Sequence, residues 1–84
     1  MSDKNNLIKT LLYRSLHRGC KETDILLGVF AQSKISTFSD EVLNLYSSLV
    51  LEDDVMIYDW ILQKIPTPEP YLGLVSDIRQ FHKL

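Results

Sequence analysis

Apolar residues recur at intervals of three and four along most of this 84-residue chain, which is the period of amphipathic helices. The first stripe comprises Leu7, Ile8, Leu11, Leu12, Tyr13 and Leu16. Gly19 follows this stripe, and glycine is the residue best suited to the positive φ with which many helices end. We therefore expect the first helix to end near His17.

Short polar residues mark the next two helix starts. Thr23 or Asp24 can cap the second helix, because such side chains accept hydrogen bonds from the unpaired backbone N–H groups of a first turn. Residues 32–38 are predicted to form a loop. Ser39 is the expected cap of the third helix, and the acidic residues that follow it complement the helix dipole.

Aspartates and prolines delimit the last two helices. Asp53 or Asp54 is expected to begin the fourth helix, and the prolines between residues 66 and 70 end it. Thr67 and Pro68 are predicted to form the cap and first turn of the fifth helix. The pattern thus predicts an all-α protein, a compact five-helix bundle. Because the chain has neither an internal repeat nor a Gly/Ser linker, we expect a single domain, residues 1–84.

The size and charge of the chain favour a protein-binding function. A chain of this length buries roughly 60–65% of its unfolded surface, which leaves little room for a deep cavity enclosing a cofactor and a substrate. The net charge of −2 argues against a nucleic-acid partner. Positive charge gathers in the first quarter of the chain and negative charge in the middle. This polarity either orients a protein encounter or reflects ordinary solvated faces.

The sequence also predicts a compartment. Cys20 is the single cysteine, so no intrachain disulfide forms, which fits a reducing compartment. No apolar run approaches the roughly 20 residues that span a bilayer, so no membrane insertion is expected. The polar opening lacks the order of a signal peptide and the Arg-rich character of a mitochondrial presequence. We expect a complete chain in the bacterial cytoplasm.

Few residues suggest chemistry. Cys20 with His17 is the one obvious pairing of a nucleophile and a base, although a lone cysteine is more often a packing residue. His17 and His82 lack metal-ligand spacing, and the aspartates at 53, 54 and 59 lack the order of a calcium loop. No glycine-rich phosphate loop is present. We therefore predict no catalytic residue, no metal and no stably bound cofactor, and hence no enzyme.

The motif Arg18-Gly19-x-x-Glu22 carries a family resemblance. Asp24 and an apolar helix ending at Phe30 follow it, then the segment Leu51–Asp54, and Trp60 comes six residues after Asp54. This order resembles the FAD assembly factors, of the SdhE type in bacteria and called succinate dehydrogenase assembly factor 2 in mitochondria. The resemblance covers nearly the whole chain.

The resemblance implies a five-helix bundle that binds the flavoprotein subunit of succinate dehydrogenase or of fumarate reductase. It also implies that the chain promotes covalent attachment of FAD to a histidine of this client, which holds the FAD. The chain itself is expected to be a monomer. The implied partner-binding residues are Arg18, Gly19, Glu22, Asp24, Arg14, His17, Tyr58 and Asp59.

The motif residues receive separate roles from this resemblance. Arg18 would make a bidentate contact with a client carboxylate or with client carbonyls. Gly19 would let the client approach, and Glu22 would either hold Arg18 or accept hydrogen bonds from the client. In the structural alternative, Gly19 terminates a helix and an incidental Arg18–Glu22 pair contributes only ~0–1 kcal/mol. Trp60 is expected in the core, with a place in the contact surface as its alternative.

Two rival functions remain open from the sequence. The first is an antitoxin-like or regulatory protein-binding module without a role in flavin attachment. The second is a small enzyme that uses Cys20 and His17.

Overall fold

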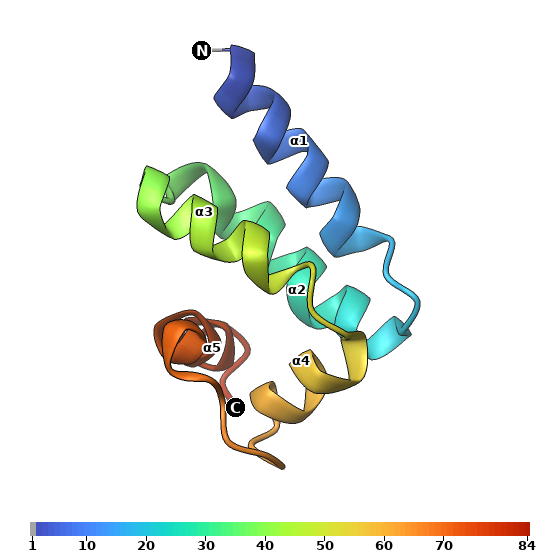
Figure 1. The fold of residues 1–84 in the computed structure, drawn as a ribbon. Helices are drawn as coiled ribbons and strands as arrows, with labels where there is room; N and C mark the ends of the chain where they lie inside the picture. The colour runs from blue at the N-terminus through green and yellow to red at the C-terminus, as the bar shows by residue number, and fades with distance from the viewer. Residues whose placement is uncertain (1) are drawn as a thin grey trace.

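The computed structural model describes residues 2–84, and within them the chain forms five α-helices and two short 3₁₀ turns (Figure 1). The all-α five-helix bundle predicted from the sequence is therefore confirmed. The α-helices are α1 (Ser2–Leu16), α2 (Lys21–Lys34), α3 (Asp40–Leu49), α4 (Asp54–Ile61) and α5 (Leu72–Phe81). The 3₁₀ turns span Ile35–Thr37 and Glu69–Tyr71.

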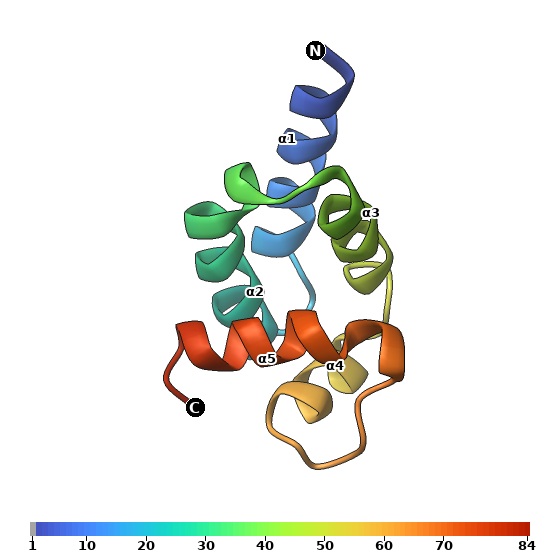
Figure 2. The ribbon, with the colours of Figure 1, turned by 90° about the vertical axis from the view of Figure 1, so that its left-hand side faces the viewer.

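Helices α1 and α2 form a hairpin, which the rest of the chain covers. The chain reverses between α1 and α2, and α3 packs alongside this hairpin (Figure 1). Helix α5 packs across α2 and against α4 (Figure 2). The first turns of α1 extend beyond the other helices in both views. An exposed ion pair between Lys4 Nζ and Asp40 Oδ1, 3.1 Å apart, links this extension to the start of α3.

One continuous apolar cluster forms the core. Its buried members come from all five α-helices, from the two 3₁₀ turns and from the residue after α3: Leu11, Leu27, Phe30, Ala31, Ile35, Leu43, Tyr46, Leu49, Val50, Ile57, Trp60, Ile61, Tyr71, Leu74, Val75 and Ile78. Trp60 is 3% exposed and lies 5.7 Å from the Tyr71 ring, which confirms the prediction of a core position. The Tyr46 hydroxyl bonds Ser15 Oγ at 2.6 Å and so joins α3 to α1.

The predicted loop at residues 32–38 is wrong over most of its length. Helix α2 continues to Lys34, and the 3₁₀ turn Ile35–Thr37 follows without a break. The reason is visible in the burial pattern, because Ala31 and Ile35 are both buried one helical turn apart. The polar residues between them face solvent, so they continue an amphipathic helix and do not end it.

Two of the predicted helix starts need correction. Cys20, not Thr23 or Asp24, occupies the cap position of α2, and its side chain makes no capping bond. The predicted Thr67 cap is also wrong, because α5 begins only at Leu72, directly after the turn Glu69–Tyr71.

Two other predicted starts are confirmed. Ser39 Oγ accepts a hydrogen bond from the Val42 N–H at 3.2 Å and so caps α3. Asp53 lies at the cap position of α4, and the helix begins at Asp54. The end of the first helix at Leu16 also agrees with the expectation of an end near His17. No helix in the described residues 2–84 is long and apolar enough to cross a membrane.

Candidate functional site

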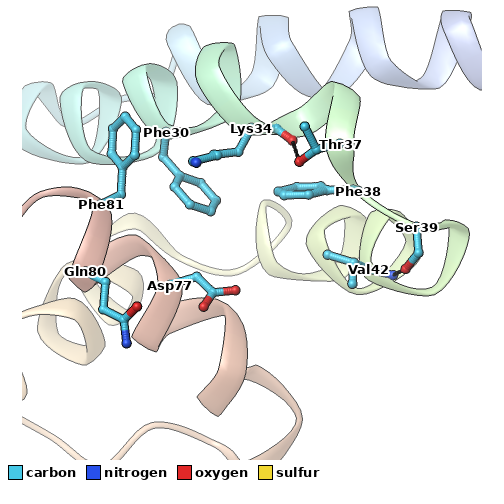
Figure 3. Close-up of a pocket in the computed structure, with 9 residues that line it drawn as sticks. All are labelled: Phe30, Lys34, Thr37, Phe38, Ser39, Val42, Asp77, Gln80 and Phe81. Atoms are coloured by element: carbon cyan, nitrogen blue, oxygen red, sulfur yellow. Dashed lines mark hydrogen bonds between the residues drawn. The ribbon is translucent and has the colours of Figure 1, made fainter.

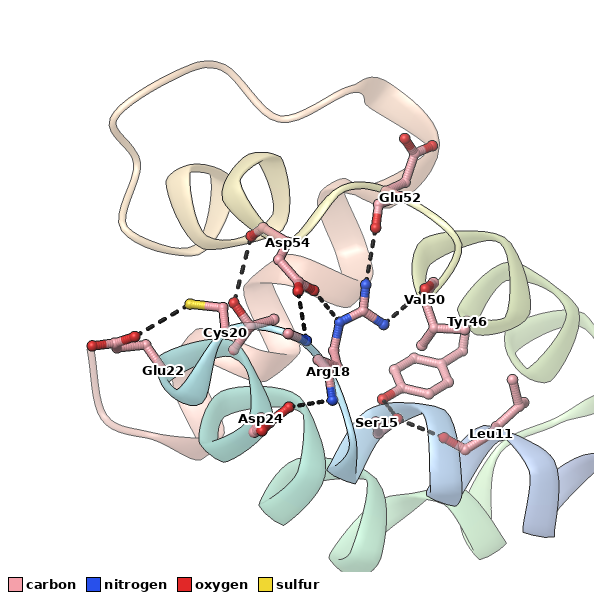
Figure 4. Close-up of polar contacts among 12 residues, drawn as sticks. Leu11, Ser15, Arg18, Cys20, Glu22, Asp24, Tyr46, Val50, Glu52 and Asp54 are labelled. Atoms are coloured by element: carbon pink, nitrogen blue, oxygen red, sulfur yellow. Dashed lines mark hydrogen bonds and ion pairs between the residues drawn. The ribbon is translucent and has the colours of Figure 1, made fainter.

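One arginine ties the loop between α1 and α2 to the loop between α3 and α4 (Figure 4). Arg18 Nε is paired with the Asp54 carboxylate, while Nη1 donates to the Val50 carbonyl at 2.7 Å and Nη2 to the Glu52 carbonyl at 2.9 Å. The Arg18 side chain is only 9% exposed. All three guanidinium nitrogens are therefore bonded within the chain. We call Arg18, Val50, Glu52 and Asp54 the Arg18 clasp.

Asp54 also fixes the backbone of the motif. Its second carboxylate oxygen, Oδ2, accepts the Gly19 N–H at 3.1 Å, and its main-chain oxygen lies 3.5 Å from Thr23 Oγ1, which donates to it. The Arg18 N–H donates to the Asp24 carboxylate. Thr23 and Asp24 thus bond groups outside their own helix, which explains why neither serves as the cap that the sequence suggested.

Neither the backbone conformation nor the packing within the chain requires glycine at position 19. The expectation of positive φ is wrong, since no glycine in residues 2–84 has positive φ. An added Cβ would lie 3.5 Å from Asp54 Oδ2, which is an ordinary van der Waals contact. Gly19 is exposed, so the space left by its missing side chain opens outward. That space is available to a molecule outside the chain.

Glu22 does not pair with Arg18. Its Oε1 accepts a hydrogen bond from Cys20 Sγ at 3.2 Å, and this bond, with help from its own backbone N–H, lowers the pKa of the Glu22 carboxyl. The pairing considered from the sequence is therefore wrong, and Asp54 is the partner of Arg18. The ionised Glu22 carboxylate stays on the exposed first turn of α2.

A shallow cavity of about 260 Å³ lies beside the clasp. We call this cavity the motif hollow. It is lined by Tyr13, Arg14, His17, Arg18, Gly19, Val50 and Asp54. The Tyr13 and His17 rings lie with their centroids 4.4 Å apart and their planes tilted by 32°. Four of the partner-binding residues predicted from the sequence thus meet in one place, namely Arg14, His17, Arg18 and Gly19.

The other predicted residues lie outside the hollow. Glu22 and Asp24 are in the first turn of α2, and Tyr58 and Asp59 are partly exposed on α4. Lys64 Nζ lies 5.6 Å from the centre of the Tyr58 ring. The proposed contacts of these residues with a partner remain predictions.

Sequence reasoning missed two members of the site. Asp54 was considered as a helix start, as part of a cation site and as a marker of the family resemblance, but not as a partner of Arg18, because nothing in the sequence links it to an arginine 36 residues away. Tyr13 was assigned to the core stripe, yet it is 65% exposed. The helical spacing could have revealed the exposure of Tyr13. Tyr13 directly follows two apolar residues, and three consecutive residues cannot all lie on one face of a helix.

The pairing of Cys20 with His17 that the sequence suggested is not formed by a hydrogen bond within the described part of the chain. Cys20 Sγ bonds Glu22 instead. No group of three His, Cys, Asp or Glu residues in positions 2–84 could hold a metal ion.

A larger cavity of about 630 Å³ lies elsewhere, between α2, α3 and α5 (Figure 3). Phe30, Phe38 and Phe81 line it, with Lys34 and Asp77 on opposite sides. It contains no residue of the motif.

Comparisons with known proteins agree on one family. A family model described as flavinator of succinate dehydrogenase matches residues 9–82 of this chain. The matched range contains the clasp and the whole motif hollow.

Relatives from eukaryotes and from a bacterium align with the chain. Succinate dehydrogenase assembly factor 2 of Dictyostelium discoideum, a mitochondrial protein, is 38% identical over 82 residues, covering 98% of this chain and 58% of the relative. Its namesake from Danio rerio is 42% identical over 78 residues, covering 89% and 49%. The FAD assembly factor SdhE of Acetobacter pasteurianus is 34% identical over 61 residues, covering 73% and 56%. The chain spans about half the length of the curated relatives it matches.

Proposed function

The chain belongs to the succinate dehydrogenase assembly factor 2 and SdhE family, and on that premise we propose that it assists covalent flavin attachment. It binds the flavoprotein subunit of succinate dehydrogenase and promotes the bond between FAD and a histidine of that subunit. The FAD stays with the client, and this chain supplies no catalytic residue.

One observation carries the docking part of the proposal. Gly19 is exposed beside the motif hollow, although neither its backbone angles nor its neighbours in the chain require glycine. Because the fold itself does not require glycine at this position, the close approach of another backbone from outside explains the absence of a Cβ. Glu22, Arg14 and His17 surround this point with exposed polar groups.

The clasp changes the role proposed for Arg18. Its guanidinium is bonded to Asp54 and to two carbonyls of its own chain. We therefore assign it to holding the docking loop in shape, and not to the direct client contact expected from the sequence. Asp24 supports the same loop through the Arg18 N–H. Tyr58 and Asp59 remain proposed outer contacts.

A helper without catalytic groups acts by shifting a population. If it binds the client conformer in which histidine and flavin are aligned more tightly than other conformers, it raises the share of that conformer. Each ~1.4 kcal/mol of differential affinity corresponds to about a tenfold shift. A shallow, preformed docking face is sufficient for this mechanism.

Several finer points belong to the same proposal. Fumarate reductase is a second candidate client, because its flavoprotein subunit poses the same histidine and flavin problem. We propose that the chain acts as a monomer. We also propose the bacterial cytoplasm as its compartment, in line with the relative from Acetobacter pasteurianus, although the relatives from Dictyostelium discoideum and Danio rerio are mitochondrial.

In-gel flavin fluorescence of the denatured flavoprotein subunit tests the proposal, because only covalently bound FAD survives denaturation. Four strains are compared: one with the chain, one without it, one with Gly19→Arg and one with Gly73→Arg. An arginine at position 19 would place a second cation beside Asp54 and fill the hollow. Gly73 is a matched control, because nothing lies within 4 Å of a Cβ added there.

Loss of fluorescence without the chain and with Gly19→Arg, but not with Gly73→Arg, is the expected result. Unchanged fluorescence in the strain without the chain would contradict the flavin role. In that case the antitoxin-like or regulatory binding module becomes the better explanation of the same surface.

A further inference from the structure

The most exposed large apolar side chains in the described residues gather around the Arg18 clasp. Leu51 is 73% exposed, Tyr13 65% and Val55 61%, which are the highest values among the large hydrophobic residues of positions 3–84. None of the three belongs to the Arg18-Gly19-x-x-Glu22 motif. We call Tyr13, Leu51 and Val55 the apolar corner.

The clasp connects the members of the apolar corner. Leu51 stands between Val50 and Glu52, the two residues whose carbonyls accept bonds from Arg18. Val55 directly follows Asp54, which pairs with Arg18, and Tyr13 lines the same hollow as Val50 and Asp54. The backbone that carries Leu51 and Val55, at the α3–α4 connection and the start of α4, is thus bonded to the loop that follows α1, the helix of Tyr13. A backbone held in this way limits the entropy lost when a partner binds.

Among the residues that line the motif hollow, the charge that remains unpaired is positive. The carboxylate of the hollow, Asp54, is occupied by Arg18 and by the Gly19 N–H. Arg14 also lines the hollow, yet it takes part in neither of the ion pairs formed within residues 3–84. A carboxylate from outside therefore finds an available guanidinium beside exposed apolar surface.

We propose that the apolar corner is the docking surface for an apolar side chain of the flavoprotein subunit, with a carboxylate of the same client segment bonded to Arg14. The inference rests on the proposed function and adds the chemistry of the partner. Contiguous exposed apolar patches rimmed by polar residues typically mark protein-binding surfaces. Burial of such anchors, more than rim charges, sets affinity.

A second copy of this chain is a less suitable occupant. A stable interface buries about 1,200–2,000 Å² in total, which three side chains on each of two small bundles do not reach. A large client adds contacts to the motif and to the α2 start on the same side of the molecule, so it reaches that area more readily.

Calorimetric titration of the purified flavoprotein subunit, prepared without covalent FAD, tests the inference. The corner variant Leu51→Ser/Val55→Thr is compared with Leu84→Ser/Val29→Thr, which makes the same two changes at exposed positions elsewhere. We expect the corner variant to bind at least about tenfold more weakly, equal to about 1.4 kcal/mol, and the control to bind like the unaltered chain.

A second pair of variants tests the proposed bond between Arg14 and a carboxylate of the client. Arg14→Glu is expected to weaken binding and to reduce its salt dependence, whereas Lys9→Glu, an exposed reversal on the same helix, changes affinity little. Circular dichroism melts of every variant establish that each one is folded at the temperature of the titration.

The outcomes separate this inference from the proposed function. If Gly19→Arg abolishes binding while the corner variant binds normally, the corner is not the docking surface and the proposed function stands. If the unaltered chain does not bind the flavoprotein subunit, both fail. If the corner variant changes only the sedimentation of the chain from dimer to monomer, a second copy occupies the corner and the inference is overturned.

Discussion

Arg18 keeps a permanent charge where little water reaches it, because its side chain is 9% exposed. A charge so placed is tolerated only when it is paired and its donors are bonded. Asp54 supplies the opposite charge, and the Val50 and Glu52 carbonyls accept the remaining hydrogen bonds. The geometry of the loop between α1 and α2 therefore depends on a residue that lies outside the motif.

We predict strong coupling between Arg18 and Asp54 in folding stability. Asp54→Asn leaves the Arg18 charge without its partner and is expected to lower the free energy of unfolding by about 3 kcal/mol. Arg18→Gln removes the charge and the two carbonyl bonds. The double variant should lose less unfolding free energy than the sum of the two single losses, by about 1–3 kcal/mol, measured by urea denaturation.

The exposed pair of Lys4 and Asp40 is the control for this cycle. Lys4→Gln and Asp40→Asn are expected to show a coupling of at most ~1 kcal/mol, because water screens both side chains. Additive losses at Arg18 and Asp54 would mean that the two residues act independently and that the clasp does not hold the loop.

The partners of Arg18 also show where prediction of the site from sequence reaches its limit. The motif located the loop, and one-turn spacing placed Arg14 and His17 beside it. The pairing of Arg18 with Asp54 depends on how two loops 36 residues apart are brought together by the whole bundle. The local sequence does not indicate that contact. Glu22, the acid within the motif, was therefore considered as the partner of Arg18, and this pairing is wrong.

At the scale of the helices, features set by neighbouring residues were predictable. Ser39 caps α3 because its side chain reaches a backbone N–H three residues later. The start of α2 was not predictable in this way, because the Asp24 carboxylate bonds Arg18 and the Thr23 hydroxyl bonds Asp54. A bond to the preceding loop and a bond to α4 had replaced the capping bonds on which the expectation rested.

The end of α4 permits a stabilising substitution. Gln63 has φ of 61°, and the Lys64 N–H closes the helix end on the Asp59 carbonyl at 2.8 Å. A residue with a Cβ is strained in this left-handed conformation, by roughly 1–2 kcal/mol. We predict that Gln63→Gly raises the free energy of unfolding by about 0.5–1 kcal/mol, measured by thermal or urea denaturation.

Gln80→Gly is the matched control, because it makes the same change inside α5. There glycine has the lower helix propensity, and the expected loss is about 1 kcal/mol. Equal effects at the two glutamines would show that the left-handed turn after α4 is not strained.

At the scale of the whole molecule, Tyr46 links stability to alkaline pH. Its ring is fully buried, and burial raises the pKa of the Tyr46 hydroxyl from 10.0 to about 12, against smaller lowering effects of the Ser15 hydrogen bond and the Arg18 charge. The fold thus favours the neutral phenol. This contribution is fully present below pH 10 and is lost as the pH rises through 12.

We expect the unaltered chain to lose about 2–3 kcal/mol of unfolding free energy through this group between pH 10 and pH 12. Tyr46→Phe removes the ionisable group, so the variant should lose correspondingly less over the same interval. Urea denaturation at a series of pH values measures both curves, and parallel curves would contradict the linkage. Lysine ionisation affects both proteins alike and cancels in the comparison.

The clasp has a last consequence for the order in which the protein matures. Synthesis delivers Arg18 long before Asp54, so the first half of a nascent chain carries the motif without the acid that shapes it. The loop between α1 and α2 reaches its final geometry only after the α3–α4 connection has emerged and folded back against α1 and α2. A chain truncated before residue 54 therefore contains the motif without the acid that fixes its loop. Under the proposed function, we expect such a chain not to bind the flavoprotein subunit.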